Sequence, residues 1–304
     1  MDQLWLLMQQ LLKMFVYMCV GFLLVRGGVL KNGESRVPAQ MLLYVFLPCT
    51  IVNSFYTGDS TGGAGRLMTS ILLGAAALAV AMLVAAVCFR KYPIDNFSAA
   101  FSNAGFMGIP LIGMILGGKN VIYIAGMVAL LNALQWSYGQ MILSGEKKVK
   151  MSALLKNPMI IAFVLGLAVY FLPVRLPDII ETCLGGMAAC NTPLAMIVLG
   201  LYLGESDLKK VFSNGRVYVT SAARLIFVPL CTLAMLSLFP AAPYEIRMAV
   251  LIASCAPVGS NVAIYAQKLK LDHAYAVGLV CASTILSIVT IPAVIFAAGA
   301  VWGI

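Results

Sequence analysis

Two short stretches, NAGFMGIP at residues 103–110 and SCAPVGSN at residues 254–261, decide the fold of this chain. Each combines asparagine, glycine and proline inside a long apolar segment. Glycine permits backbone that is not helical and proline removes a hydrogen-bond donor, so both stretches are expected to unwind in mid-membrane. Unwound backbone at that depth requires protein or a water-filled cavity to satisfy it. The stretches therefore predict a central site, with tight packing of small residues between helices as the alternative.

The composition predicts a lipid bilayer as the environment of the chain. Its 304 residues are 62% hydrophobic and 10% charged, whereas soluble domains are about 45–50% apolar and about 25% charged. The net charge of +9 is carried by too few residues to indicate binding to nucleic acid. An anionic cytoplasmic membrane face explains the positive charge better.

Ten segments are long and apolar enough to be transmembrane helices, which need about 20 such residues. We predict spans at 4–25, 38–57, 67–89, 97–117, 121–143, 157–174, 183–203, 217–239, 247–266 and 274–298. The first lacks the basic start and the cleavage site of a signal peptide, so we expect it to remain in the mature protein.

The distribution of basic residues predicts the orientation of these spans. Fourteen of the 20 lysines and arginines fall in one set of alternate loops and four in the other, while Lys13 and Arg224 lie within spans. Loops rich in lysine and arginine face the cytoplasm. Both termini are therefore expected on the extracytoplasmic side of the cell membrane.

Matching prolines indicate an internal repeat. Pro48 and Pro193 are 145 residues apart, and Pro110 and Pro257 are 147 apart. Because each half would hold five spans, an odd number, the second half must enter the membrane inverted, as in many secondary transporters. We predict a first repeat at 1–145, a cytoplasmic basic linker at 146–156 and a second, inverted repeat at 157–304.

Five stretches of the sequence resemble the auxin efflux carrier family of PIN-like membrane transport proteins. They run through the whole chain and are LYVFLP at 43–48, NAGFMGIPL at 103–111, NTPLAMIVLGLYL at 191–203, APVGSN at 256–261, and STILS at 283–287 continuing to Pro292. The chain lacks the long cytosolic loop of the plant hormone carriers. The resemblance is therefore to a bacterial member of the family.

The resemblance implies an all-α membrane protein of ten helices, whose fourth and ninth helices break and cross at the centre. A scaffold and a mobile transport part are implied, as is a homodimer, with a small organic anion bound beside the crossover. Asn103, Pro110 and Pro257 match the crossover residues, and Asn132 matches a polar residue of the fifth helix that faces the site.

The residues themselves favour a carboxylate as the substrate. Broken helices expose N-terminal ends that each carry roughly half a positive charge, and neutral amides and hydroxyls can orient an anion there. Each amide could instead bond one helix to another. The candidate substrate-binding residues are Asn103, Gly105, Gly108, Pro110, Asn132, Pro257, Gly259, Ser260 and Asn261.

The ionisable residues bear on how transport is driven. Lys13 and Arg224 either snorkel to the membrane surface or face the cavity and favour an anion. All eleven acidic residues are predicted in loops or at span ends. Since proton relays usually need a carboxylate in mid-membrane, we favour uniport or anion export over tight cation coupling, with Asp95 at the entrance of the fourth span leaving the question open.

Other functions have weaker support in the sequence. An intramembrane enzyme would need a nucleophile motif, a metal motif or a pair of membrane acids, and none is present. The lone His273 has no cluster of ligands around it, so neither a metal nor another cofactor is expected. A channel would need a continuous polar pore, whereas the polar residues cluster at the two predicted breaks and not along one helix face. The closest alternative to an anion carrier is a sodium-coupled symporter of the bile-acid type.

Overall fold

The computed structural model describes residues 2–31, 33–58, 63–145, 157–172, 175–207, 209 and 213–303, and within these ranges the chain is all-helical. The predicted linker at 146–156 lies outside the described residues. The α-helices are α1 (Asp2–Arg26), α2 (Arg36–Met41), α3 (Leu47–Thr57), α4 (Gly63–Phe89), α5 (Pro93–Ala100), α6 (Ile109–Ile115), α7 (Ile122–Leu134), α8 (Gln140–Ser144), α10 (Pro158–Phe171), α11 (Asp178–Glu205), α13 (Gly215–Ala222), α14 (Val228–Ser237), α15 (Tyr244–Cys255), α16 (Asn261–Lys268) and α17 (His273–Trp302). Five short turns of wider or tighter helix join them: η1 (Leu42–Phe46), η2 (Ala104–Gly108), η3 (Gly118–Val121), η4 (Gln135–Gly139) and η5 (Ala223–Phe227).

Six of the continuous helical stretches among the described residues are long and apolar enough to cross a membrane. They are Arg36–Thr57, Gly63–Phe89, Gly118–Ser144, Asp178–Glu205, Gly215–Ser237 and His273–Trp302. Two shorter apolar helices, Ala104–Ile115 and Pro158–Phe171, accompany them. The predicted all-helical membrane fold is confirmed at this level, and the count of ten spans stays a prediction.

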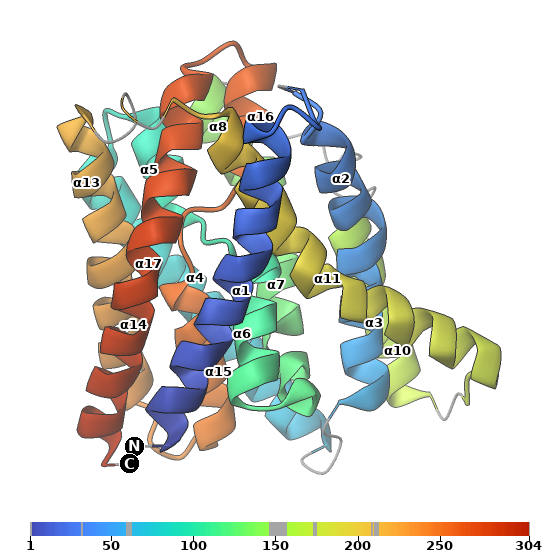
Figure 1. Ribbon diagram of the computed structural model, residues 1–304. Coiled ribbons are helices and arrows are strands. Elements are labelled where there is room, and N and C mark those ends of the chain that lie inside the picture. Colours follow the sequence, from blue (N-terminus) through green and yellow to red (C-terminus); the bar gives the residue numbers. More distant parts are fainter. Residues whose placement is uncertain are drawn as a thin grey trace.

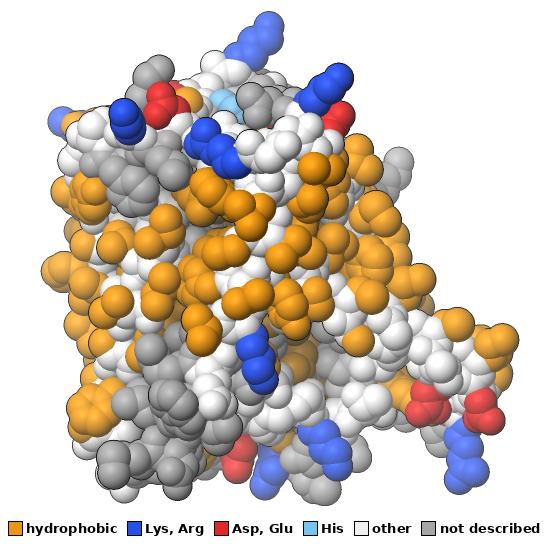
Figure 2. All heavy atoms as spheres, in the orientation of Figure 1, with side chains coloured by type: hydrophobic (Ala, Val, Ile, Leu, Met, Phe, Trp, Pro, Cys, Tyr) orange, Lys and Arg blue, Asp and Glu red, His pale blue; other side chains and the backbone are white. Residues whose placement is uncertain are grey.

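The surface of the visible face is arranged as a bilayer requires, and the two chain ends lie at one side of it. Figure 2 shows hydrophobic side chains in a broad band around the middle of the visible face, with most lysines, arginines and acids above and below it. In Figure 1, α1 begins and α17 ends at one side of this band, while α8, α16 and the start of α2 lie at the other. Both chain ends lie on one side when the number of membrane crossings is even.

In the part of the chain that the structure describes, three of the four π-helical turns end two residues before a proline. The turns η1, η2 and η5 are each followed by a helix whose second residue is Pro48, Pro110 or Pro229. A proline cannot donate to the carbonyl four residues earlier and its ring clashes with that carbonyl. The helical stretch nevertheless continues from each π turn through its proline, so these prolines do not break helices.

The helices α1 and α11 approach each other through glycines. A Cβ atom built on Gly200 would lie 1.9 Å from the carbonyl oxygen of Met18, and one on Gly21 would lie 2.1 Å from the carbonyl oxygen of Ile197. No side chain fits at such distances. Small residues that let two backbones approach this closely are a common means of helix association in membranes.

Candidate functional site at two broken helices

The helical backbone is interrupted at two places that come together in the interior. Helix α5 ends at Ala100, and Phe101 is extended, with φ −112° and ψ 113°. Helix α15 ends at Cys255, followed by Ala256 with φ −59° and ψ 143°. Helical structure resumes at Ala104 in the first segment and at Asn261 in the second.

The two extended segments satisfy each other's backbone groups. Ser102 and Val258 form an isolated antiparallel bridge. The amide of Asn103 donates to the carbonyl of Pro257 at 2.7 Å, and the amide of Gly259 donates to the carbonyl of Phe101 at 3.0 Å. Such mutual bonding is what non-helical backbone needs at membrane depth.

The position of the first break corrects one expectation from the sequence. Gly105, Gly108 and Pro110 were expected in unwound backbone, but all three lie in the helical stretch Ala104–Ile115. The π turn η2 absorbs Pro110, so the chain unwinds before the glycines and not at the proline. In the second segment the expectation holds, since Pro257, Gly259 and Ser260 all lie in the break between α15 and α16.

Gly259 permits the close approach of the two segments. A Cβ atom there would lie 3.1 Å from the carbonyl oxygen of Ser102 and 3.2 Å from that of Phe101. A Cβ on Gly105 would lie 3.1 Å from the side chain of Leu47, whereas one on Gly108 would make an ordinary contact, 3.4 Å from Ala253. These glycines shape the site by permitting contact and offer no side chain to a ligand.

A small cavity of about 20 Å³ lies at the meeting point of the two breaks. This volume admits about one water molecule. Six of the predicted site residues line it, together with Gln135 and several apolar side chains. The residues that line it are Leu43, Leu47, Ser102, Asn103, Gly105, Phe106, Leu131, Asn132, Gln135, Gly259, Ser260 and Asn261.

Asn103 lines this cavity and has an unused hydrogen-bond donor. Its side chain is 5% exposed and its Nδ2 atom has no hydrogen-bond partner. Asn103 is also the N-cap of η2, without a side-chain capping bond. A buried amide donor without a partner costs free energy, so this atom is suited to receive an acceptor from a ligand.

The other amides at the site are already engaged. Asn132 Nδ2 donates to the carbonyl of Val128 in its own helix at 2.8 Å. Asn261 Nδ2 donates to Gln135 Oε1 at 2.5 Å, which ties α16 to η4. Gln135 is 1% exposed and was not among the residues predicted from the sequence. Its position three residues after Asn132, on the same side of the helix, is the signal that could have identified it.

A much larger vestibule of about 650 Å³ opens beside the central cavity, at the side of the molecule where α2 begins and α16 lies. Two basic side chains, Arg36 and Lys268, and one carboxylate, Glu205, line it, as do the aromatic side chains of Tyr44, Trp136 and Tyr265. Leu43 and Asn261 line both spaces. The bond between Asn261 and Gln135 therefore lies where the vestibule meets the cavity.

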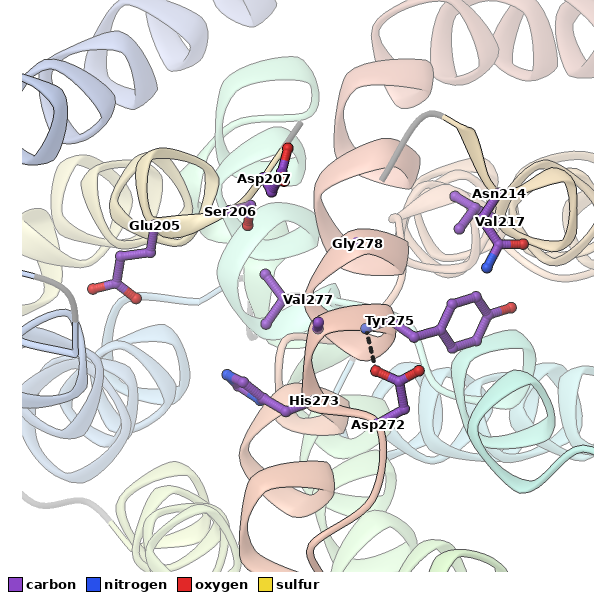
Figure 3. Close-up of a pocket in the computed structure, with 11 residues that line it drawn as sticks. Glu205, Ser206, Asp207, Asn214, Val217, Asp272, His273, Tyr275, Val277 and Gly278 are labelled. Atoms are coloured by element: carbon purple, nitrogen blue, oxygen red, sulfur yellow. Dashed lines mark hydrogen bonds between the residues drawn. The ribbon is translucent and has the colours of Figure 1, made fainter. Parts of the chain in front are cut away.

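Another large pocket, of about 470 Å³, has a different character (Figure 3). Its lining includes Glu205, Asp207 and Asp272, and in Figure 3 these carboxylates come from the end of α11 and the start of α17. Asp272 caps α17 by accepting from the amide of Tyr275 at 2.9 Å. Of the described residues, three carboxylates and no lysine or arginine line this pocket, and such a lining repels anions, so the pocket is a poor place for the expected substrate.

The two basic residues within predicted spans differ in their surroundings. Lys13 is exposed on α1. Arg224 is 1% exposed, so it does not snorkel to the membrane surface. Neither residue lines the central cavity. Of the two alternatives left open by the sequence, snorkelling is excluded for Arg224, and facing the central cavity applies to neither residue.

Asp95 is more deeply buried than its predicted place at a span entrance implied. Its side chain is 2% exposed and forms an ion pair with Arg216. It also accepts hydrogen bonds from Thr220 Oγ1, at 2.6 Å, and from the hydroxyl of Tyr275. The carboxylate thus ties α5, which leads into the first break, to α13 and α17.

We expect Asp95→Asn to lower thermal stability. The variant loses the ion pair with Arg216, which is half-exposed and therefore partly screened by solvent. It also weakens two hydrogen bonds to a charged acceptor, each worth about 1.5–3 kcal/mol. Glu245→Gln is the matched control, since Glu245 also lies two residues after a proline at the start of a broken helix and is exposed. Melting of the purified proteins checks this. Equal melting temperatures for the two variants would contradict the role given to Asp95.

Among the described residues, no group of three or more histidine, cysteine, aspartate or glutamate side chains is placed to hold a metal ion. The polar groups of the central site are amides, hydroxyls and backbone. These are neutral donors and acceptors suited to orienting a small polar ligand.

The helices and the buried polar site describe a multi-pass, all-helical membrane protein. A family model described as membrane transport protein matches residues 6–295, so the chain belongs to this family of PIN-like transporters. An "Uncharacterized transporter" of Methanothermobacter thermautotrophicus is 26% identical over 299 residues, covering 93% of this chain and 96% of that protein. A "Putative malonate transporter" of Rhizobium meliloti is 23% identical over 239 residues, covering 75% of this chain and 74% of that protein.

Proposed function

We propose that this protein is a secondary transporter that moves a small organic anion, a carboxylate, through the cell membrane by alternating access at the central cavity. The unpartnered Nδ2 of Asn103 carries this proposal. It is a buried donor at the start of a helix, beside a cavity, in a chain that belongs to a transporter family. We propose no enzymatic activity and no cofactor.

The electrostatics of the broken helices support an anion. The stretches Ala104–Ile115 and α16 both begin at the cavity. The first amides of a helix have no partner within it, and its N-terminal end carries roughly half a positive charge. Two such ends and the Asn103 amide attract a carboxylate without an ionised side chain, which leaves binding weak enough for release.

We propose ten membrane-crossing segments in two inverted repeats, 1–145 and 157–304. The breaks support this arrangement, because each falls in the fourth predicted span of its half, and the two extended segments pair in antiparallel fashion. The mobile part would contain the broken helices, and the closely packed α1 and α11 would belong to the scaffold.

The sizes of the two spaces support a route for the substrate. A cavity of about 20 Å³ is too small for an organic anion, whereas the adjoining vestibule is about 650 Å³. We propose that the structure is closed at the centre and that the anion enters from the vestibule when the Asn261–Gln135 bond opens. Arg36 and Lys268 would attract it there.

We propose that the vestibule faces the cytoplasm, because it opens on the side of the lysine- and arginine-rich loops. In a background without the eight native cysteines, a cysteine at Glu146 should react with an impermeant maleimide only from the cytoplasmic side. A cysteine at Lys119, in the opposite set of loops, should react only from outside. The reverse pattern would contradict the proposed orientation.

We also propose a homodimer, for which the support is the family resemblance. Chemical cross-linking in native membranes and native mass spectrometry in mild detergent should give a species of twice the chain mass of 32.4 kDa. Monomer alone by both methods would contradict the proposal.

Malonate is the first substrate to test, because one relative is named for its transport. Reconstituted protein should take up labelled malonate, or another small carboxylate from a panel of mono- and dicarboxylates, indole acids and amino acids. A selective ligand should also raise the melting temperature, since it binds the folded state. No uptake and no stabilisation by any member of the panel would contradict the proposed function.

Two alternatives give different results in the same experiment. A sodium-coupled symporter of the bile-acid type would take up its anion only with a sodium gradient. A channel would conduct without saturating at high substrate concentration. The proposed carrier shows saturable uptake that does not depend on sodium.

A further inference from the structure

Arg224 is the largest side chain that is fully buried among the described residues, and it lies outside the central cavity. It lies in η5, within the stretch Gly215–Ser237, well away from either end of that stretch. No carboxylate of the described residues pairs with it; the ion pair of Arg216 and Asp95 lies elsewhere. A buried charge without a carboxylate partner needs another source of compensation.

The guanidinium of Arg224 obtains this compensation from both broken helices. Its Nη1 donates to the carbonyl oxygen of Ala99 at 3.0 Å, and its Nη2 donates to the carbonyl oxygen of Ser254. Ala99 is the second-to-last residue of α5, and Ser254 is the second-to-last residue of α15. One side chain thus binds the C-terminal ends of the two half-helices that lead into the breaks.

The charges at these ends balance. The last carbonyls of a helix lack partners within it, and each C-terminal end carries roughly half a negative charge. Two ends together offset about one positive charge, which is what the guanidinium supplies. In transporters with broken helices, such C-terminal ends and unwound carbonyls are where sodium ions or protons bind.

We infer that Arg224 is a tethered cation that occupies the place of a coupling ion behind the crossover of the broken helices. It holds the two C-terminal ends together while the two N-terminal ends face the substrate cavity. Transport therefore needs no sodium at this position. The uptake experiment for this inference rests on the proposed transport function, whereas the melting experiment needs no substrate.

Removing the side chain creates a test that needs no substrate. Arg224→Ala leaves two helix ends without a cation and a space of guanidinium shape. Purified Arg224→Ala should melt below the wild type, and millimolar guanidinium chloride should restore much of the loss, whereas choline chloride at equal ionic strength should not. Sodium should restore part of it, because a small cation can bind the same carbonyls.

Arg247→Ala is the control for unspecific effects of guanidinium. The guanidinium of Arg247 lies over the ring of Trp302, at 4.7 Å from its centroid, and so contacts an aromatic ring and not the C-terminal ends of α5 and α15. Its loss should not be repaired by guanidinium or sodium. Restoration of Arg247→Ala to the same extent as Arg224→Ala would overturn the inference, as would no restoration of Arg224→Ala.

Two further variants decide the case if Arg224→Ala does not fold. Arg224→Lys keeps the charge and Arg224→Gln keeps much of the length without the charge. The lysine variant should be produced in folded form and the glutamine variant should not, or should melt well below it. Equal stability of the two would show that charge is not what the position requires.

The uptake arm measures the consequence for coupling. Wild-type uptake of malonate, or of the carboxylate that stabilises the protein, should be the same in sodium and in choline. Arg224→Ala should lose about ten-fold or more of its rate, the scale of one hydrogen bond to a charged group, and regain rate with guanidinium. Sodium-dependent uptake by the wild type would overturn the inference. Absence of all uptake would count against the proposed function alone, since the melting experiment still tests the role of Arg224.

Discussion

Asn103→Ala is expected to abolish most substrate binding while leaving the fold intact. The variant removes one or two hydrogen bonds to a charged ligand, each worth about 1.5–3 kcal/mol, which corresponds to a ten-fold or greater loss of affinity at about 1.4 kcal/mol per decade. The melting temperature without substrate should not fall, because Asn103 Nδ2 has no partner to lose. Affinity for the carboxylate and melting of the empty protein measure the two effects.

Asn157→Ala is the matched control for this experiment. Asn157 is also buried, at 1% exposed, but its Oδ1 accepts from the amide of Met159 at 2.8 Å and so caps α10. Its removal should cost about 0.5–2 kcal/mol of stability and leave affinity unchanged. Normal flux and a lowered melting temperature in Asn103→Ala would mean that Asn103 is structural, and the proposed site would be withdrawn.

Gly200→Ala is expected to have the largest effect on folding of any single methyl group. The new Cβ would lie 1.9 Å from the backbone oxygen of Met18, and neither backbone can move without separating α1 from α11. We expect little or no folded protein in detergent extracts, measured by monodisperse elution in gel filtration.

Gly185→Ala on the same helix is the control for Gly200→Ala. Nothing lies within 4 Å of a Cβ atom at Gly185. Replacing a glycine inside a helix by alanine stabilises by about 0.5–1 kcal/mol where space allows. A Gly200→Ala protein that elutes and melts like Gly185→Ala would contradict the close packing of α1 on α11.

The all-helical membrane fold and both breaks are predictable from the sequence, because glycine, proline and asparagine clustered within an apolar run disfavour a continuous membrane helix. The side of Pro110 on which the chain unwinds is not predictable in this way. A proline ends a helix in some proteins and follows a π turn in others. Which of the two occurs depends on what packs against the carbonyls that the proline leaves without a donor. Here the π turn η2 retains the helix, and the break moves to residues 101–103.

Residues whose roles depend on distant partners escape prediction from a single sequence. Gln135 reaches Asn261 across 126 positions, and Asp95 reaches Tyr275 across 180. Arg224 is visible in the sequence as a charge within a span, but its function depends on two carbonyls that come from separate broken helices. No local pattern places those carbonyls together.

The central claim is that an organic anion binds where the two breaks meet, and locating a bound anion tests it most directly. Crystals grown with bromomalonate, a carboxylate with an anomalous scatterer, would show the bromine position without reference to transport. We predict an anomalous peak in an enlarged central cavity, within contact of Asn103 and Ser260. A peak confined to the vestibule or to the acidic pocket of Figure 3, in protein that binds bromomalonate in solution, would contradict the claim.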